Sequence, residues 1–326
     1  MADSATLAQT RYTEVQSITR GVVDAVQALW RDVTPDRILS AMSGETGRAI
    51  LAAVTTGQMT AAAGAQAFVT ASMLAQGVAA GPVGLLNPSA LVGVAADARP
   101  LATLLYVPAV TTAQTLALGA SPEAAALAGL NQMSMLVSTT VADTARAATS
   151  VAMAAEPRCV SYARVVRLPA CARCVVLAGR QYSHSTGFQR HPRCDCGMEP
   201  MSESEWRGTD TPEDVFRRMS PAEQRKRLGA AGVKALEAGA DLGQLVNARR
   251  GLSTAATGRG PMRVTTEGVT RRGIGGRALN SGYTKDAGKR YERAKEARLM
   301  PESIFKLAGD DREHQIAMLR KHGYIT

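Results

Sequence analysis

Four cysteines and one histidine lie within 26 residues of the chain, in a spacing that could hold a metal ion. Cys171 and Cys174 form a Cys-x2-Cys pair, and His191 comes three positions before a Cys194-x-Cys196 pair. Zinc prefers four thiolate or imidazole ligands in a tetrahedron, and a Cys-x2-Cys turn places two thiolates on one side of such an ion. Five donors compete for four positions, so the fourth ligand is left open among His191, Cys194 and Cys196.

The chemistry of this cluster favours a structural zinc over a catalytic one. A saturated four-ligand site stabilises a small loop-rich domain, whereas a catalytic zinc keeps an open position beside a base. Glu199 is near in sequence, and Asp195 is a candidate to orient the His191 ring. The His-x-Glu and Pro-Cys-x2-Cys order of zinc deaminases is missing, as are the His-Glu-x2-His, Walker A and Gly-x-Ser-x-Gly motifs. We therefore expect no enzymatic activity; a zinc-dependent nuclease or other DNA-processing enzyme is the alternative.

The cysteine count also bears on the compartment and on the plainer interpretation of the cluster. Five cysteines, four of them clustered, are too few for a secreted disulfide framework, and the polar N-terminal stretch lacks a signal-peptide pattern. We expect synthesis in a cytosol. The plain alternative is a group of buried thiols whose spacing is accidental. Cys159 is expected to be a small core residue, and His184, His314 and His322 are expected to be surface or packing residues.

Helices are expected to dominate the part of the chain that precedes the cluster. Aromatic residues make up only 4% of the sequence, so the cores must be built from Ala, Val, Leu and Met, which suit close helix packing. Apolar residues at spacings of three and four predict helices at 12–30 and 121–153. The Ala-rich stretch 44–77 is also expected to be helical, and Thr34-Pro35 marks a further helix start. The charge-free stretch 49–96 is interrupted by Gly, Pro and polar residues, so we expect no membrane span.

The periodicity changes after Pro157. The β-branched stretch 159–167 predicts a strand that leads into the cysteine cluster. Thr211-Pro212 and Ser220-Pro221 are helix starts, and the Gly-, Thr- and Arg-rich stretch 251–283 predicts a flexible arm or extended loop. Helices are expected again at 286–299, 301–307 and 310–322, with an apolar ending that would suit docking.

These patterns predict a mainly α fold. An Ala-rich helical N-terminal half is followed by a small α+β zinc-pinned domain and by a basic helical or extended C-terminal region. The expected domains are an Ala-rich helical domain at 1–156, a zinc-binding core at 157–250, and a Gly/Arg-rich arm with C-terminal helices at 251–326.

The charge is distributed unevenly between the two halves. The whole chain carries a net charge of +10, yet residues 1–156 carry −3 and residues 157–326 carry +13, with no lysine before Lys226. Such a basic half predicts sequence-independent, salt-sensitive contacts with the phosphates of nucleic acid. The alternative is a solvated helix face whose arginines pair with internal carboxylates. The candidate nucleic-acid contacts are Arg225, Lys226, Arg227, Arg249, Arg250, Arg271, Arg272, Lys289 and Arg290.

Three blocks of the second half resemble a known family. The stretches 168–179 and 187–196, the stretch 239–251, and the ending 300–325 occur in the order typical of the MuF-like minor capsid proteins of tailed phages, especially those of actinobacteria. The family's Cys and His positions carry over to Cys171, Cys174, His191, Cys194 and Cys196, and no catalytic residue comes with them. The Ala-rich first half is similar in character but contains no diagnostic block.

The resemblance implies a head morphogenesis protein, packaged in low copy inside the capsid near the portal and present in the host cytoplasm during assembly. It implies portal protein or major capsid protein as partners, together with packaged double-stranded DNA, and no small-molecule substrate. With the charge pattern, we expect the helical half to face proteins and the basic half to face DNA. The third possibility, a host DNA-binding protein with a zinc knuckle, is left open by the residues alone.

Overall fold

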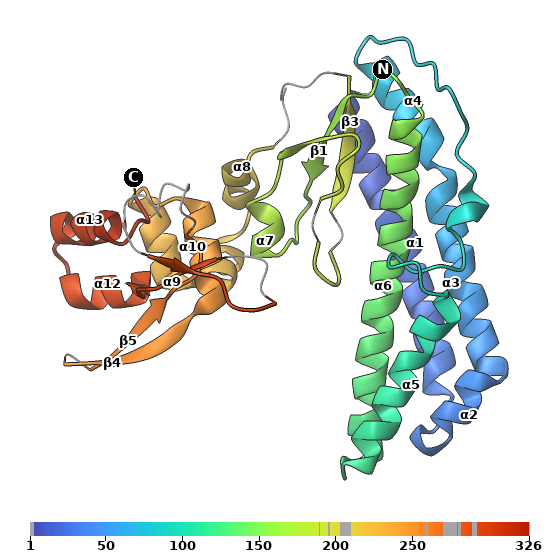
Figure 1. Ribbon diagram of the computed structural model, residues 1–326, viewed down its shortest axis with the longest axis horizontal. Helices are drawn as coiled ribbons and strands as arrows, with labels where there is room; N and C mark the ends of the chain where they lie inside the picture. Colours follow the sequence, from blue (N-terminus) through green and yellow to red (C-terminus); the bar gives the residue numbers. More distant parts are fainter. Residues whose placement is uncertain are drawn as a thin grey trace. The chain divides into compact units, whose positions relative to one another are not determined.

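The chain forms two compact units in the computed structural model. The structure describes residues 3–188, 190–194, 196–202, 210–258, 260–269, 279, 282–288 and 292–325. The first unit comprises Met1–Arg167 with Gly179–Thr209, and the second comprises Leu168–Ala178 with Asp210–Thr326. Helices, 3-10 turns included, account for 59% of the residues that the structure describes, which confirms the mainly α fold (Figure 1). The expected domain boundaries at residues 156 and 250 stay a prediction.

A helical bundle makes up most of the first unit. Its helices are α1 (Ser4–Arg31), α2 (Ile38–Ser43), α3 (Glu45–Ala63), α4 (Ala65–Ala75), α5 (Leu101–Ala117) and α6 (Pro122–Ala154), with a 3-10 turn at Pro35–Arg37. The long helix α6 packs against α1, α3, α4 and α5 (Figure 1). The helices predicted at 12–30, 44–77 and 121–153 are confirmed as α1, as α3 with α4, and as α6. Helix α5 was not predicted.

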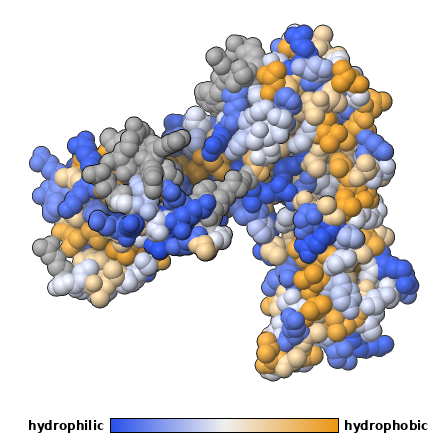
Figure 2. Space-filling view, in the orientation of Figure 1, coloured by the Kyte–Doolittle hydropathy of each residue, from blue (hydrophilic) through white to orange (hydrophobic). Residues whose placement is uncertain are grey.

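Helix packing in this unit is close because the side chains at the contacts are small. A Cβ atom on Gly129 of α6 would lie 1.9 Å from the Thr112 Oγ1 of α5 and 2.7 Å from a ring carbon of Trp30. A Cβ atom on Gly57 of α3 would lie 2.4 Å from a methyl group of Val22 on α1. Neither position has room for a side chain. Hydrophobic residues also reach the surface of this unit, as Figure 2 shows along its helices.

A three-stranded antiparallel sheet completes the first unit. Its strands are β1 (Ser161–Val165), β2 (Gln181–Ser183) and β3 (Gly197–Met201), in the order β2-β1-β3. All five residues of β1 are buried, and β3 packs against α1, α4 and α6. The register places Arg164 opposite Met198. The strand predicted at 159–167 is confirmed.

The second unit combines short helices with small sheets. Its helices are α7 (Ala172–Val175), α8 (Pro212–Arg217), α9 (Pro221–Glu237), α10 (Leu242–Ala248), α12 (Pro301–Ala308) and α13 (Arg312–Lys321). Its strands are β4 (Ser253–Thr257), β5 (Gly260–Thr265), β6 (Tyr283–Thr284), β7 (Arg293–Ala294) and β8 (Arg298–Leu299), paired as β4-β5-β8 and β6-β7. Both predicted helix starts are confirmed, because Thr211 with Asp214 and Ser220 with Glu223 form capping boxes.

Two predictions in this unit are wrong. The described part of the expected flexible arm at 251–283 contains the β4-β5 hairpin, in which Met262, Val264 and Thr265 are buried, while 259, 270–278, 280 and 281 lie outside the described residues. The expected helix at 286–299 contains strands β7 and β8 instead. Local composition favoured an arm and a helix, but both segments form strands because they pair with neighbouring strands. Such dependence on context is common for β structure. The helices predicted at 301–307 and 310–322 are confirmed as α12 and α13.

The apolar ending of the chain packs inside the second unit. Tyr324 is fully buried; its ring lies 4.3 Å from the guanidinium carbon of Arg298, and its hydroxyl lies 3.4 Å from the Met300 sulfur. The Asp241 N–H donates to the Tyr324 carbonyl at 2.8 Å. Gly323, which follows the C-cap residue His322, takes a positive φ of 68°, as is common for the glycine that ends a helix.

Candidate metal centre

The first cysteine pair lies at the start of α7. Cys171 is the N-cap of this one-turn helix, and its Sγ accepts the Cys174 N–H at 3.4 Å. Cys174 is only 2% exposed, and Cys171 is half-buried. A helical turn of this length places residues three apart on the same side. The predicted Cys-x2-Cys turn is therefore present.

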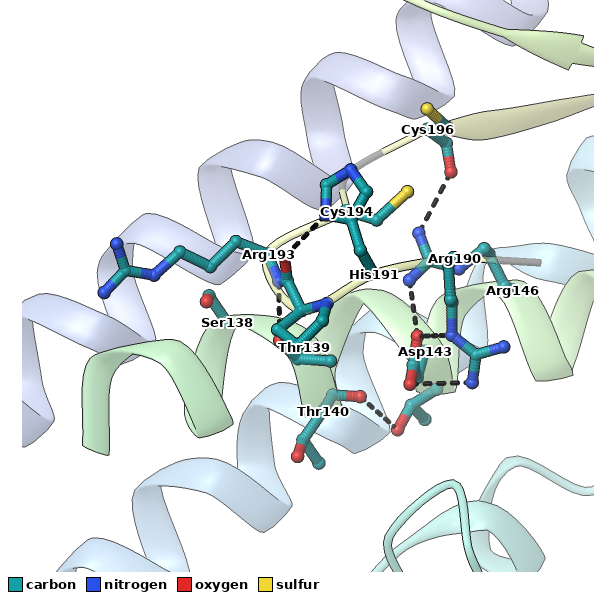
Figure 3. Close-up of polar contacts among 12 residues, drawn as sticks. Ser138, Thr139, Thr140, Asp143, Arg146, Arg190, His191, Arg193, Cys194 and Cys196 are labelled. Atoms are coloured by element: carbon teal, nitrogen blue, oxygen red, sulfur yellow. Dashed lines mark hydrogen bonds and ion pairs between the residues drawn. The ribbon is translucent and has the colours of Figure 1, made fainter. Parts of the chain in front are cut away.

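The second cysteine pair lies just before β3. The Cys194 N–H donates to the His191 carbonyl at 3.0 Å, in a turn where Arg193 takes a positive φ of 62°. Cys194 and Cys196 are each 1% exposed, and His191 is half-buried with its Nδ1 2.7 Å from the Pro192 carbonyl. The turn thus brings one imidazole and two thiols into one short segment (Figure 3).

All five predicted ligands fall into two groups that could hold a metal ion. In the first group, the ligand atoms of Cys171, Cys174 and His191 all lie within 4.8 Å of one another. In the second group, those of Cys174, Cys194 and Cys196 do. Cys174 belongs to both groups. Within the described part of the chain, neither group includes a carboxylate, and Asp195 lies outside the described residues.

A buried arginine lies against the second cysteine pair. The Nη2 atom of Arg164, on β1, is 3.5 Å from the Cys194 Sγ and 3.4 Å from the Cys196 Sγ. Arg164 is 2% exposed, and its guanidinium carbon lies 4.3 Å from the centre of the Phe188 ring. A guanidinium is a strong donor that favours charged acceptors. A positively charged group therefore lies beside both sulfurs.

A second arginine fixes the backbone of the same segment. Arg146 on α6 donates through Nη1 to the Cys196 carbonyl at 3.0 Å and pairs through Nη2 with Asp143 at 2.5 Å. Asp143 also pairs with Arg190 (Figure 3). The loop that contains His191 and the two cysteines is thus tied to α6.

The donor set fits zinc by its chemistry. Soft thiolates with one imidazole are the ligands of structural zinc sites, and carboxylate or water ligands would be needed for magnesium or calcium. With an ion bound, the Arg164 guanidinium would offset part of the negative charge of three or four thiolate ligands. The residues present could therefore hold zinc, with the fourth ligand still open among His191, Cys194 and Cys196.

The remaining cysteine and histidines have other surroundings. Cys159 is 2% exposed, and burial raises the pKa of its thiol to about 11, which suits the expected core residue. His184 Nδ1 lies 3.2 Å from the Val160 carbonyl, and His314 is exposed on α13. Burial lowers the pKa of His322 to about 4, and the nearby charges of Lys321 and Arg298 act in the same direction.

The candidate nucleic-acid contacts differ in how they are used. Arg225, Lys226 and Arg250 are exposed. Arg227 donates to the Ala170 carbonyl at 2.7 Å, and Arg249 bonds the Leu228 carbonyl at 2.7 Å and Glu302 at 2.9 Å. Arg249 thereby bonds the backbone of α9 at the residue before Gly229, where the helix is kinked. The other four candidates, Arg271, Arg272, Lys289 and Arg290, lie outside the described residues.

Fold and site together define a mainly helical protein with a Cys/His cluster that could hold a metal ion. The VG15 protein family model matches residues 1–222, about two thirds of the chain. The chain therefore belongs to the VG15 protein family, a family of phage virion-associated proteins. Comparison with curated proteins and with solved structures finds no match. Of the helices that the structure describes, none has the length and apolar character to cross a membrane.

Sequence reasoning missed two parts of this result. The family match includes the whole Ala-rich half, where the residues showed no diagnostic block, and it ends before the blocks at 239–251 and 300–325. The arginines at 146 and 164 were not predicted as site residues. The position of Arg164 in the middle of the strand predicted at 159–167 was an available signal, because a buried guanidinium requires a nearby acceptor.

Proposed function

We propose that this virion-related phage protein is a MuF-like minor capsid protein that acts in head morphogenesis. The observation that carries the proposal is the VG15 family match over residues 1–222, combined with the Cys/His cluster inside the matched range. The order of the sequence blocks further supports the MuF-like assignment. In this proposal the protein lies inside the capsid near the portal, and it belongs to a phage of an actinobacterium.

The metal would serve as a structural element. Zinc, when bound, would supply strong bonds between segments that are distant in sequence. Cys171 and Cys174 would contribute thiolates from α7, and two of His191, Cys194 and Cys196 would complete the set. Arg164 would balance the charge of the thiolates, and Arg146 would hold the Cys196 backbone in place. We propose no catalytic step, because the cluster's chemistry supports a saturated site.

The second unit would contact packaged double-stranded DNA. The exposed Arg225 and Lys226 on α9 are the leading candidates to meet phosphates, and Arg250 is exposed as well. Arg227 and Arg249 bond to groups within the unit. Contacts of this kind carry no base sequence information and weaken as salt rises. The helical first unit would contact portal protein or major capsid protein.

The test is the location of the protein in the virion. Purified particles of the phage that encodes the chain are treated with protease before and after the heads are opened, and the chain is quantified by mass spectrometry. We expect low copy number, protection in intact particles and digestion in opened ones. Absence from particles, or digestion in intact particles, would overturn a location inside the capsid. Normal, DNA-filled heads made without the gene would overturn a role in morphogenesis.

A further inference from the structure

A pocket of about 370 Å³ opens on the first unit, where Met198 of β3 and residues of α6 line it. Helix α6, the loop at 91–98, and Gly187, Phe188, Arg190 and Met198 form its walls. The walls are largely apolar, with contributions from Leu91, Val94, Ala147, Phe188 and Met198. None of the five candidate metal ligands lines it. The volume is in the range of pockets that hold small organic groups and short side-chain clusters.

Two arginines and one aspartate form the charged part of this pocket, which Thr144 and Ser150 also line. Asp143 is 8% exposed and accepts from both Arg146 and Arg190, which approach it from different elements (Figure 3). Two guanidiniums against one carboxylate give the pocket a local charge of +1. The Arg146 side chain is 9% exposed, and its Nε is buried without a hydrogen-bond partner among the described residues. Such a charge excess in a partly buried place favours an anionic ligand.

Arg190 is the arginine that a ligand would reach. Its side chain is 35% exposed, whereas that of Arg146 is 9% exposed. Within the described residues, Arg190 bonds Asp143 through Nε and Nη2, the latter at 2.7 Å. Its Nη1 remains a donor for a ligand. The carboxylate of Asp143 holds the guanidinium in place, so little side-chain freedom is lost on binding.

The shape and the charge together restrict the chemistry of the ligand. A small inorganic anion would satisfy Arg190 but would leave the walls at Val94, Phe188 and Met198 in contact with water. A purely apolar ligand would bury the Arg190 donor without an acceptor, which is costly. A ligand that joins a carboxylate to an apolar group meets both requirements.

We propose that this pocket binds a segment of a protein partner in which an acidic side chain lies next to apolar side chains. The carboxylate would bond Arg190, and the apolar side chains would lie against Phe188, Met198 and the 91–98 loop. The proposal goes beyond the proposed function, because it assigns a peptide-binding site and the chemistry of its ligand to the helical unit. It requires neither bound metal nor DNA.

The test uses a peptide titration of the full chain labelled with ¹³C at the methionine methyl groups. Met198 lines the pocket, and buried Met133 in the bundle core serves as the internal reference. The probes are acetyl-Ser-Leu-Glu-Leu-Ser-amide, the same peptide with Gln in place of Glu, and the same peptide with Gly in place of both Leu. Inorganic phosphate and a short DNA duplex are added separately.

Three variants separate the pocket from general effects. Arg190→Gln removes the exposed donor, and Ala147→Trp fills the pocket from an exposed position of α6. Arg193→Gln is the matched control: it removes the same charge from an exposed position three residues along the loop, and it does not line the pocket. Thermal melting of each variant reports whether it remains folded.

We expect saturable shifts of Met198 with the Glu peptide and affinity about tenfold weaker with the Gln peptide, the size of one charge-assisted hydrogen bond. Arg190→Gln should remove that preference, Ala147→Trp should abolish binding, and Arg193→Gln should change neither. Equal binding of the Glu and Gln peptides would overturn the proposal. So would equal binding of the Gly-substituted peptide, no saturable shift, or full saturation of the Met198 shift by phosphate or DNA alone.

Discussion

The Arg164 Nη2 atom lies 3.4 Å from the Cys196 Sγ and 3.5 Å from the Cys194 Sγ. One buried guanidinium thus contacts both sulfurs of the second cysteine pair, from a strand that precedes them by about thirty residues. Because Arg164 does not itself bind metal, its proposed role is to position these thiolates and to balance their charge.

Replacing Arg164 should weaken metal binding. We expect Arg164→Met to lower zinc affinity by about tenfold or more, the size usual for groups that orient metal ligands, and Arg164→Lys to restore part of it. Competition with a chromophoric chelator measures the affinity. Arg167→Met, at the exposed end of the same strand region, is the control and should bind zinc as the wild type does. Equal affinities for all four proteins would show that the contact has no effect on the metal.

The cysteines of the cluster should differ from Cys159 in metal content. We expect about one zinc per chain by elemental analysis, strong loss of zinc in Cys174→Ala, and full zinc in Cys159→Ala. Cys159→Ala should still unfold at a lower temperature, because it removes a buried side chain. Addition of a chelator should lower the melting temperature of the wild type but not that of Cys174→Ala. If the purified protein contains no zinc and the chelator does not change its melting temperature, the cysteines of the cluster are ordinary buried residues and not metal ligands.

The exposed basic residues of α9 should matter for DNA more than equally charged residues elsewhere. We expect the double variant Arg225→Gln with Lys226→Gln to bind duplex DNA more weakly. The slope of the logarithm of the binding constant against the logarithm of the salt concentration should also be shallower, by the amount that about two phosphate contacts contribute. The double variant Arg320→Gln with Lys321→Gln on α13 removes the same charge from exposed positions and should bind as the wild type does. Fluorescence anisotropy at several salt concentrations measures both quantities. An equal loss in the two double variants would indicate a net-charge effect.

Acid should destabilise the second unit through His322. The folded state holds the pKa of this imidazole at about 4, below its ordinary value of 6.5, so the unfolded chain takes up a proton first as pH falls. The contribution of the neutral His322 ring to the free energy of unfolding is fully present above pH 6.5 and is lost as the pH falls from about 6.5 to about 4. Urea unfolding at several pH values should therefore show a smaller loss in His322→Gln than in the wild type. The same substitution at exposed His314 controls for the loss of one imidazole, and identical curves for His322→Gln and the wild type would contradict the prediction.

Regular helices were predictable where the sequence carries local signals. The apolar stripe of α1, the Ser121-Pro122 start of α6 and the capping boxes at Thr211 and Ser220 act within a few residues, so the chain itself shows them. Helix α5 carries no amphipathic stripe and contains Pro108, so its pattern gave no sign. Strands β7 and β8 are two residues each and exist through pairing with β6 and β5, which no local pattern reveals.

The candidate metal centre was predictable as a set of residues but not as an environment. The spacing of four cysteines and one histidine identified all five possible ligands, because the type of each ligand and the number of residues between them can be read from the sequence. The guanidinium that lies against two of the sulfurs comes from β1, and its approach depends on sheet register. Likewise, Arg249 was grouped with DNA contacts because it is basic, whereas in the fold it bonds the backbone of α9 at the residue before Gly229.

The contact at Gly129, where a single added carbon would meet Thr112 and Trp30, bears on how this unit can change over time. In a bundle of alanine and glycine, many substitutions that shorten a side chain have few atoms to remove. Substitutions that add atoms meet a neighbouring helix at once. Substitutions to larger residues at the helix contacts should therefore be tolerated less well than substitutions to smaller ones. Sequence differences between related proteins should occur mainly on the outer faces of the bundle and in its loops.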